Sequence, residues 1–294
     1  MAQIPERPDG LILLDKPEGL TSHDCVARVR KLLPKKVKVG HGGTLDPFCT
    51  GLLILLVGRC TRLSSFFQGT EKTYEGVIRF GEGTDTLDRD GKVTEMGPIP
   101  ELTEAGWRET ARAFVGKSEQ VPPLFSAKHV GKERAYELAR RGEKPELKAS
   151  TVEIFSFEVT NLDFRDLSFS MHCSSGTYVR AVARDIGERV GSPAHCHILR
   201  RTEVGIFRVE NANSLQDPFA KKGFIPFDEI DLGFPAVGVD YQDEKRVLNG
   251  MTVIAPRDLR GEGLSVKLIG PSGRFIAVCR LEGRELKPET VFPL

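Results

Sequence analysis

Residues 40–47 hold an imidazole, a hydroxyl and a carboxylate within a short stretch, and these are groups used in acid–base chemistry. The segment reads Gly-His-Gly-Gly-Thr-Leu-Asp-Pro. Its glycines permit positive φ angles and let a ligand approach the backbone closely, while Pro47 restricts Asp46 to extended geometry. The pattern predicts that a loop presents the Asp46 carboxylate, instead of using it as a helix cap. The alternative is an ordinary Asp-Pro turn.

A second segment, residues 173–180, predicts an anion site. It reads Cys-Ser-Ser-Gly-Thr-Tyr-Val-Arg and passes from a strand into the start of a helix. Backbone N–H groups at a helix start, together with the Arg180 guanidinium, favour an anion. The alternative is a tight junction with Arg180 on a solvated face. Taken singly, Tyr74, His41 and Leu199 are ordinary core or loop residues.

Three further patterns resemble cofactor or metal motifs but fail in detail. Residues 84–91 resemble a calcium loop, yet Thr86 and Gly97 stand where an EF-hand needs Asp and Glu. Residues 116–118 end like a P-loop but follow a helix and lack its first glycine. Residues 195–197 read His-Cys-His, and neighbours in an extended segment point to opposite faces. We therefore expect no metal and no cofactor.

Charge is unevenly distributed although the 294-residue chain has a net charge of only +1. Residues 28–38 carry six basic side chains and no acidic one, and residues 128–148 carry seven basic against four acidic ones. Acidic residues gather at 82–95 and 228–244. This segregation suits a protein with one side facing a polyanion, or else reflects solvated helix faces.

Composition places the chain among cytoplasmic globular proteins. The longest apolar run, residues 52–57, is too short to cross a bilayer, and residues 1–10 contain no apolar signal-peptide core. The six cysteines show no C-x-x-C spacing, which favours reduced thiols over a disulfide framework.

The elements that position these residues follow from hydrophobic periodicity and turn residues. A buried strand at 11–14 is followed by a helix from Ser22, as its cap, to about Leu33. The further strands that we expect are at 52–57, 74–80, 152–160, 166–173, 196–200 and 204–210, with helices near 61–67, 103–115, 133–141 and 177–190. The order of these elements favours a mixed α+β sheet over a doubly wound parallel one.

Three loop-like segments lie between or after these elements, and a run of short strands ends the chain. Residues 81–100 read as an acidic loop, 118–150 as a basic insertion and 212–234 as a linker. Short strand-like runs follow at 236–240, 252–254, 264–269, 274–281 and 290–292. They suggest a small β-barrel, so we expect two domains, at 1–232 and 233–294.

Five segments together resemble the TruB family of pseudouridine synthases, which modify uridine 55 in the T arm of tRNA. They are GLILLDKPEGLTSHD (10–24), VGHGGTLDPFCTGLL (39–53), KTYEGVIRFGEGTDTLDRDG (72–91), CSSGTYVRAVARDIGE (173–188) and HILRRTEVGIF (197–207). The family often has Thr, Ala and Lys where this chain has Gly42, Thr44 and Ser175. The resemblance covers most of residues 10–210 and implies a mainly antiparallel sheet with flanking helices. Its C-terminal part, which is weaker, implies a small PUA-like barrel.

The resemblance also implies a role for each matching residue. Asp46 matches the catalytic aspartate, as nucleophile toward the sugar or as base in a glycal route, and Arg180 matches its paired arginine, which keeps it ionised. Tyr74 matches the tyrosine that stacks on the target base and assists proton removal from C5. The substrate-binding positions that the resemblance implies are His41, which fills the space left by the flipped base, Tyr178 and Leu199, which line the pocket, and Asp88 and Lys16.

The resemblance implies an isomerisation without redox change, acting on the T-arm stem-loop of tRNA with no nucleotide cofactor and no membrane, as a monomer. The 118–150 insertion and the basic 28–38 segment then supply salt-dependent RNA affinity. Two alternatives remain open. One is an RNA-binding or folding module with secondary catalysis. The other is a glycoside hydrolase, which needs a second carboxylate such as Asp88 or Asp90 beside Asp46.

Overall fold

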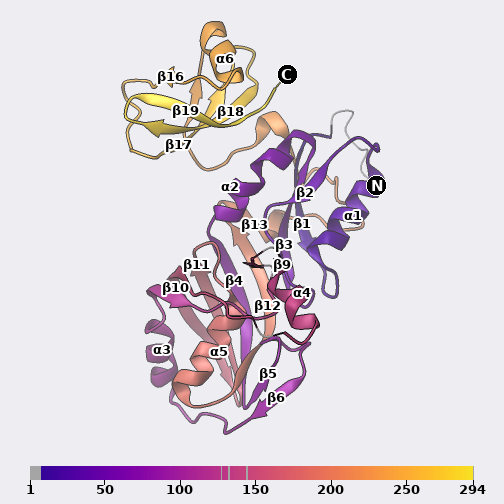
Figure 1. The fold of residues 1–294 in the computed structure, drawn as a ribbon, viewed down its shortest axis with the longest axis vertical. Coiled ribbons are helices and arrows are strands. Elements are labelled where there is room, and N and C mark those ends of the chain that lie inside the picture. The colour runs from indigo at the N-terminus through magenta and orange to yellow at the C-terminus, as the bar shows by residue number, and fades with distance from the viewer. Residues whose placement is uncertain (1–7, 127, 132, 144, 294) are drawn as a thin grey trace.

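Two sheets organise the chain in the computed structural model, which describes residues 8–126, 128–131, 133–143 and 145–293 (Figure 1). The larger sheet has ten strands in the order β14-β1-β3-β12-β4-β11-β10-β7, with β2 beside β3 and β13 beside β12. Its strands are β1 (Gly10–Lys16), β2 (Val39–His41), β3 (Thr50–Val57), β4 (Lys72–Phe80), β7 (Gly116–Gln120), β10 (Ser150–Asp163), β11 (Asp166–Cys173), β12 (Ala194–Val204), β13 (Phe207–Arg208) and β14 (Phe224–Pro226). Its neighbouring strands are antiparallel apart from β3 and β12, which confirms the mixed, mainly antiparallel α+β fold.

The uninterrupted apolar run of β3 is explained by burial on both faces of this sheet. Leu53 and Leu55 enter one core, whereas Leu52 and Ile54 enter a second core on the opposite face. The alternation of strand side chains is the cause, since successive residues point to opposite faces. The sheet therefore separates two hydrophobic cores.

Helices α1, α3 and α5 cover the sheet on the face that carries the first core. Helix α1 contributes Cys25, Val26 and Val29 to it, α5 packs on β12, and α3 packs on β10. The helices are α1 (Ser22–Leu32), α2 (Ser64–Gly69), α3 (Glu104–Arg112), α4 (Ala135–Arg140), α5 (Val179–Val190) and α6 (Tyr241–Leu248), with 3-10 turns at Gly58–Leu63, Val209–Asn211 and Phe227–Glu229. No helix in the described part of the chain is long and apolar enough to cross a membrane.

The second sheet lies beside α2 at one end of the molecule (Figure 1). Its strands, in the order β15-β17-β18-β19-β16, are β15 (Ala236–Gly238), β17 (Ser265–Ile269), β18 (Phe275–Glu282), β19 (Glu285–Val291) and β16 (Val253–Ile254). Phe275 and Phe292 pack with Phe227 against the second core of the larger sheet. This curled sheet corresponds to the small C-terminal barrel expected from the sequence.

Several local expectations need correction. Thr21, not Ser22, caps α1, because its hydroxyl accepts from the Asp24 N–H in a capping box. The strand expected at 196–200 is longer and forms β12 from Ala194 to Val204, whereas the one expected at 204–210 is reduced to the two residues of β13, followed by a 3-10 turn. The expected loop at 81–100 contains a hairpin, β5 (Glu82–Thr84) and β6 (Val93–Met96), and the insertion contains a second one, β8 (His129–Val130) and β9 (Glu133–Arg134). The expectation of reduced cysteines, by contrast, agrees with the structure, in which all six are buried free thiols.

Candidate active site

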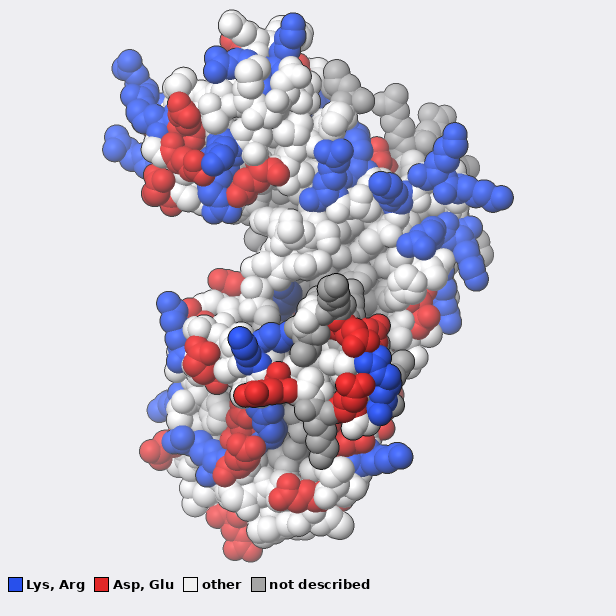
Figure 2. Space-filling view, viewed as in Figure 1, with Lys and Arg blue, Asp and Glu red and all other residues white. Residues whose placement is uncertain are grey.

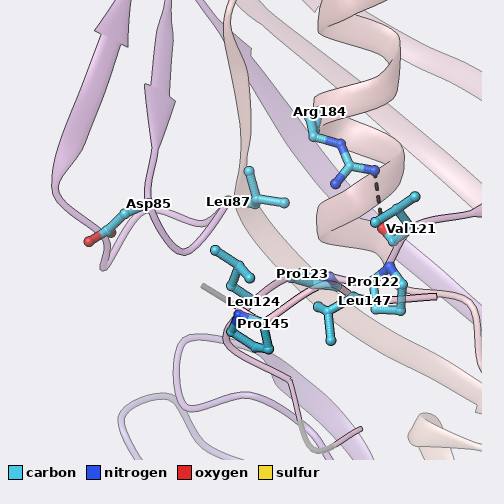
Figure 3. Close-up of a pocket in the computed structure, with 9 residues that line it drawn as sticks. All are labelled: Asp85, Leu87, Val121, Pro122, Pro123, Leu124, Pro145, Leu147 and Arg184. Carbon is cyan, nitrogen blue, oxygen red and sulfur yellow. Dashed lines mark hydrogen bonds between the residues drawn. The ribbon is translucent and has the colours of Figure 1, made fainter. Parts of the chain in front are cut away.

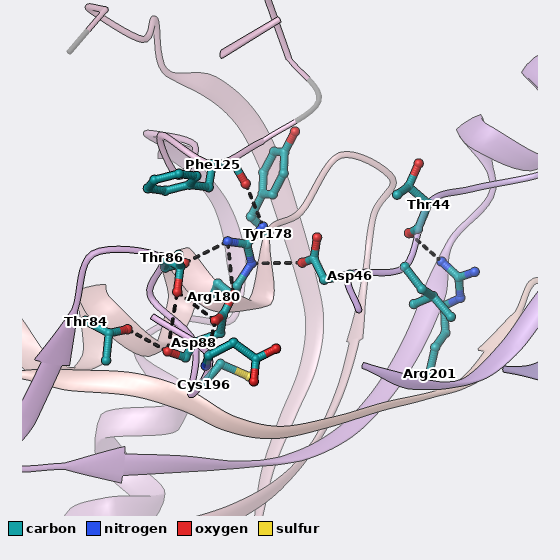
Figure 4. Close-up of polar contacts among 12 residues, drawn as sticks. Thr44, Asp46, Thr84, Thr86, Asp88, Phe125, Tyr178, Arg180, Cys196 and Arg201 are labelled. Carbon is teal, nitrogen blue, oxygen red and sulfur yellow. Dashed lines mark hydrogen bonds and ion pairs between the residues drawn. The ribbon is translucent and has the colours of Figure 1, made fainter. Parts of the chain in front are cut away.

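Arg180 links the two carboxylates that the sequence singled out (Figure 4). Its Nε lies 2.9 Å from Asp46 Oδ2, in an ion pair whose N–H does not point along the contact, and its NH1 lies 3.4 Å from Asp88 Oδ2. NH1 also donates to the Thr86 carbonyl at 2.7 Å and NH2 to the Phe125 carbonyl at 2.9 Å. The guanidinium is only 4% exposed. Its fork of donors thus joins three separate segments in one buried cluster.

The Asp46 loop is held from beneath by buried side chains. Ser22 accepts from the Leu45 N–H at 2.8 Å and donates to the Leu45 carbonyl at 3.1 Å. The Lys16 ammonium donates to the Pro47 carbonyl at 3.2 Å. These bonds fix the residues on both sides of Asp46, and the Asp46 side chain remains 37% exposed. The loop therefore offers one carboxylate to solvent and to a ligand.

Asp88 comes from the loop between β5 and β6 and is 6% exposed. Its Oδ1 accepts from the Thr86 hydroxyl at 2.6 Å and from the Asp90 N–H at 3.1 Å. Burial raises the pKa of this carboxyl, while the Thr86 bond and the Arg180 charge oppose that rise. Asp88 is therefore tied to its own loop and to Arg180, and it is not free to act as a second catalytic carboxylate of the glycosidase kind.

Tyr74 and Leu199 face the same side of the sheet. Tyr74 on β4 is opposite Arg201 on β12, and Leu199 lies two residues before Arg201 in the same register. Both side chains belong to the core cluster that includes Leu45 and Cys49, the neighbours of the Asp46 loop. Burial raises the pKa of Tyr74 to about 12, although the Arg201 guanidinium opposes the shift. Its phenol is thus neutral at physiological pH.

His41 and Lys16 flank the Asp46 loop and are not among the residues that contact Asp46 directly. His41 Nδ1 accepts from the Gly43 N–H at 3.4 Å, and burial lowers the pKa of its imidazole. Lys16 is fully buried, and its ammonium also donates to the Pro17 and Leu20 carbonyls. In this arrangement Lys16 supports the loop from inside, and a direct contact with substrate stays a prediction.

Tyr178 is the residue immediately before α5. Its backbone N–H donates to Gln120 Oε1 at 2.8 Å, and its carbonyl accepts from Gln120 Nε2 at 3.3 Å. Burial raises the pKa of its phenol. Figure 4 shows its ring near Phe125 and Asp46.

Sequence reasoning missed two supporting residues, Arg201 and Gln120. Arg201 is 2% exposed and donates to the carbonyls of Leu52, Thr44 and Gly43. The pair Arg200-Arg201 is visible in the sequence, but nothing local shows that Arg201 is the buried one, because a buried cation needs several partners and these are distant in sequence. No feature of the sequence marks Gln120.

A small hollow of about 230 Å³ lies next to the Asp88 loop (Figure 3). Leu87, Pro122 and Leu147 line it, with Arg184 on α5 at its edge. A second hollow of about 470 Å³ lies near Asp15 and Arg200, which form an ion pair. Among the described residues no group of three His, Cys, Asp or Glu side chains could hold a metal.

The basic segments differ in how far acids neutralise them. Figure 2 shows Lys and Arg side chains gathered on the flank of the molecule where α1 lies in Figure 1. Arg28, Lys31 and Lys35 are exposed there. In the insertion, by contrast, Arg141 is paired with Glu133 and Glu143. The α1 segment is therefore the less compensated of the two.

Comparison with known proteins gives concordant matches. The family model of the TruB family pseudouridylate synthase N-terminal domain matches residues 30–179. The tRNA pseudouridine synthase B of Thermobifida fusca is 40% identical over 293 residues, which cover 97% of this chain and 98% of that protein. The protein of the same name from Aquifex aeolicus is 39% identical over 287 residues, 96% of this chain and 98% of its own.

Solved structures resemble the fold. A chain in the crystal structure of a Cbf5-Nop10-Gar1 complex has a TM-score of 0.72 at 24% identity, covering 97% of this chain and 85% of that one. A chain of the archaeal box H/ACA sRNP Nop10-Cbf5 complex has a TM-score of 0.70 at 22% identity, with 98% and 89% covered. At these identities the likeness concerns the fold alone.

Proposed function

Because the chain belongs to the TruB family of pseudouridylate synthases, we propose that this enzyme isomerises uridine to pseudouridine in tRNA, at position 55 of the T loop. Relatives named tRNA pseudouridine synthase B match it along nearly their whole length, which supports the tRNA substrate. The position within the T loop rests on the family resemblance of the motifs around Asp46 and Arg180.

The proposed mechanism is supported above all by one observation: the partly exposed Asp46 carboxylate forms an ion pair with the buried Arg180. In the reaction the N1–C1′ bond breaks, C5 joins C1′, the C5 hydrogen leaves as a proton, and N1 takes up a proton. Asp46 acts either by attacking C1′ or by removing a sugar proton in a glycal route. The Arg180 guanidinium pairs with this carboxylate and orients it toward the bound nucleotide.

The neighbouring side chains form the base pocket in this proposal. The neutral Tyr74 ring stacks on the target uracil and assists removal of the C5 proton, and Leu199 and Tyr178 enclose the base. His41 occupies the place that the flipped uridine leaves in the T loop. Asp88 contributes by holding Arg180.

Support for RNA binding comes from charge and from the two sheets. We assign residues 1–232 to a catalytic domain and 233–294 to a small PUA-like RNA-binding domain, in keeping with the two separate sheets. The basic residues of 28–38 and of the 118–150 insertion meet the phosphate backbone. The enzyme acts as a monomer in the cytoplasm and needs no cofactor in this scheme.

The proposal is tested with full-length tRNA transcripts labelled with tritium at C5 of uridine. We expect tritium release by the wild-type enzyme from a normal transcript and none from a transcript with cytidine at position 55. Equal release from both transcripts would show that the modified uridine is at another position in tRNA. Tight binding without any release would favour the alternative of an RNA-binding or folding module.

A further inference from the structure

The start of α5 lacks the side-chain cap that helices commonly have. Its N-cap residue is Tyr178, whose side chain accepts no hydrogen bond from the first turn. Backbone groups at a helix start need partners from elsewhere. Arg180 is the second residue of this helix, so the direction of its side chain depends on how the backbone at Tyr178 is held.

Gln120 supplies that hold. It is the last residue of the edge strand β7, its side chain is 4% exposed, and its amide pairs with both backbone groups of Tyr178. The amide oxygen accepts at 2.8 Å and the amide nitrogen donates at 3.3 Å. A primary amide is suited to this double contact because it offers an acceptor and a donor side by side.

The residues after Gln120 pack along α5. The Val121 carbonyl accepts from Arg184 at 3.1 Å, and the Phe125 carbonyl accepts from Arg180 at 2.9 Å. The segment 120–125 therefore meets the first two turns of α5 at three points. Arg180 reaches Asp46 and Asp88 from a helix that this segment holds in place.

We propose that Gln120 is a positioning residue for the Arg180–Asp46 pair. It touches neither the reacting atoms nor the substrate, and it acts by fixing the backbone at Tyr178 from which Arg180 projects. Without its amide the helix start has greater freedom, and the guanidinium does not meet Asp46, Asp88 and the Thr86 carbonyl at the same time. The inference rests on the proposed function, because it concerns the step that Asp46 performs.

The test measures single-turnover tritium release and RNA affinity with Gln120→Met and Gln120→Glu. Methionine has a similar length and makes neither bond, whereas glutamate still accepts from the Tyr178 N–H but cannot donate to its carbonyl. We expect the rate constant to fall about tenfold or more with methionine, and by at least as much with glutamate, because its buried carboxylate faces the Tyr178 carbonyl without a donor. The dissociation constant for the T-arm stem-loop should change less than about threefold.

Asn213→Leu is the matched control. Asn213 is also a 4% exposed amide that bridges backbone groups, at Pro218, Ala220 and Gly223, away from Arg180. The Asn213→Leu substitution should lower the melting temperature and leave the rate constant of tritium release by the folded enzyme unchanged. If Gln120→Met melts below the assay temperature, single-turnover release measured below its melting temperature decides the question.

A double-mutant cycle with Arg180→Lys separates positioning from general stability. If Gln120 acts through Arg180, its substitution has little further effect on the rate in the Arg180→Lys background. Equal losses in both backgrounds, or a full rate for both folded Gln120 variants, would overturn the inference. Failure of the wild type to release tritium would instead refute the proposed function.

Discussion

Replacing Arg180 with methionine should lower the free energy of unfolding, because the buried Asp88 carboxylate loses its counterion. Asp88 is 6% exposed and has Arg180 as its ion-pair partner. Methionine keeps the apolar stem of the arginine but removes the charge. It also removes the donors to the Thr86 and Phe125 carbonyls.

The magnitude follows from breaking one side of a buried ion pair, which costs about 3–5 kcal/mol. For a chain of this size we therefore expect the melting temperature to fall by roughly 6–10 °C. Arg108→Met is the control. Arg108 and Glu104 are joined by two hydrogen bonds but are 56% and 67% exposed, so the loss there should be about 1 kcal/mol or less.

A second substitution separates stability from catalysis. In Arg180→Met with Asp88→Asn, the buried charge is gone, and we expect most of the lost stability to return. Turnover should stay abolished, because Asp46 still lacks its arginine. Acid should have a similar effect in the single variant, since burial raises the pKa of Asp88 and protonation removes the charge as the pH falls.

Thermal melts of the four proteins, paired with single-turnover tritium release, provide the measurement. The reasoning is refuted if Arg180→Met melts within about 2 °C of the wild type, since a buried carboxylate without its counterion would then be tolerated. It is also refuted if the double variant regains activity.

Three further substitutions test other parts of the account. As the pH rises from about 10 to 12, the wild type should lose stability relative to Tyr74→Phe, by about 1 kcal/mol at pH 11, because the phenol ionises at lower pH in the unfolded chain than in the folded one. Denaturant titrations measure this, and free energies of unfolding that change in parallel with pH would contradict it. Lys16→Met should slow tritium release while RNA affinity, measured by filter binding, changes less than about threefold; a large affinity loss with normal turnover would instead make Lys16 a phosphate contact. Replacing Arg28, Lys31 and Lys35 together with alanine should reduce the salt slope of tRNA affinity by roughly two; an unchanged slope would remove α1 from the RNA interface.

The sequence predicted elements whose burial pattern is strong and local. The apolar run at 52–57 became β3, with its side chains divided between two cores. Gly191 ends α5 in the left-handed conformation, as its position after Val190 suggested. The family motifs also named Asp46 and Arg180, and the fold brings them together across 134 positions of the chain.

Elements that depend on tertiary contacts were missed. The hairpin strand β6 is exposed along its whole length, so its sequence shows no apolar alternation. Helix α6 buries only Val247, so its charged sequence shows no apolar stripe, and no helix was expected there. The Arg201 side chain on β12 can be buried because the carbonyls of Leu52, Thr44 and Gly43 accept hydrogen bonds from its guanidinium. No local rule anticipates such partners.

The same limit applies to Gln120. Its two hydrogen bonds reach a residue 58 positions away, and glutamine is mostly exposed in proteins, so the residue type does not indicate a buried bridging role. A local reading can propose which groups perform the chemistry, but the residues that aim those groups are defined by the packed structure.

The central claim is that the Asp46 carboxylate performs the isomerisation. The most direct test compares wild type and Asp46→Asn for tritium release from a T-arm stem-loop labelled at C5 of uridine, with RNA affinity measured on the same preparations. We predict release by the wild type, none by the variant, and similar affinities, because asparagine is nearly isosteric. Release by Asp46→Asn at the wild-type rate would contradict the account.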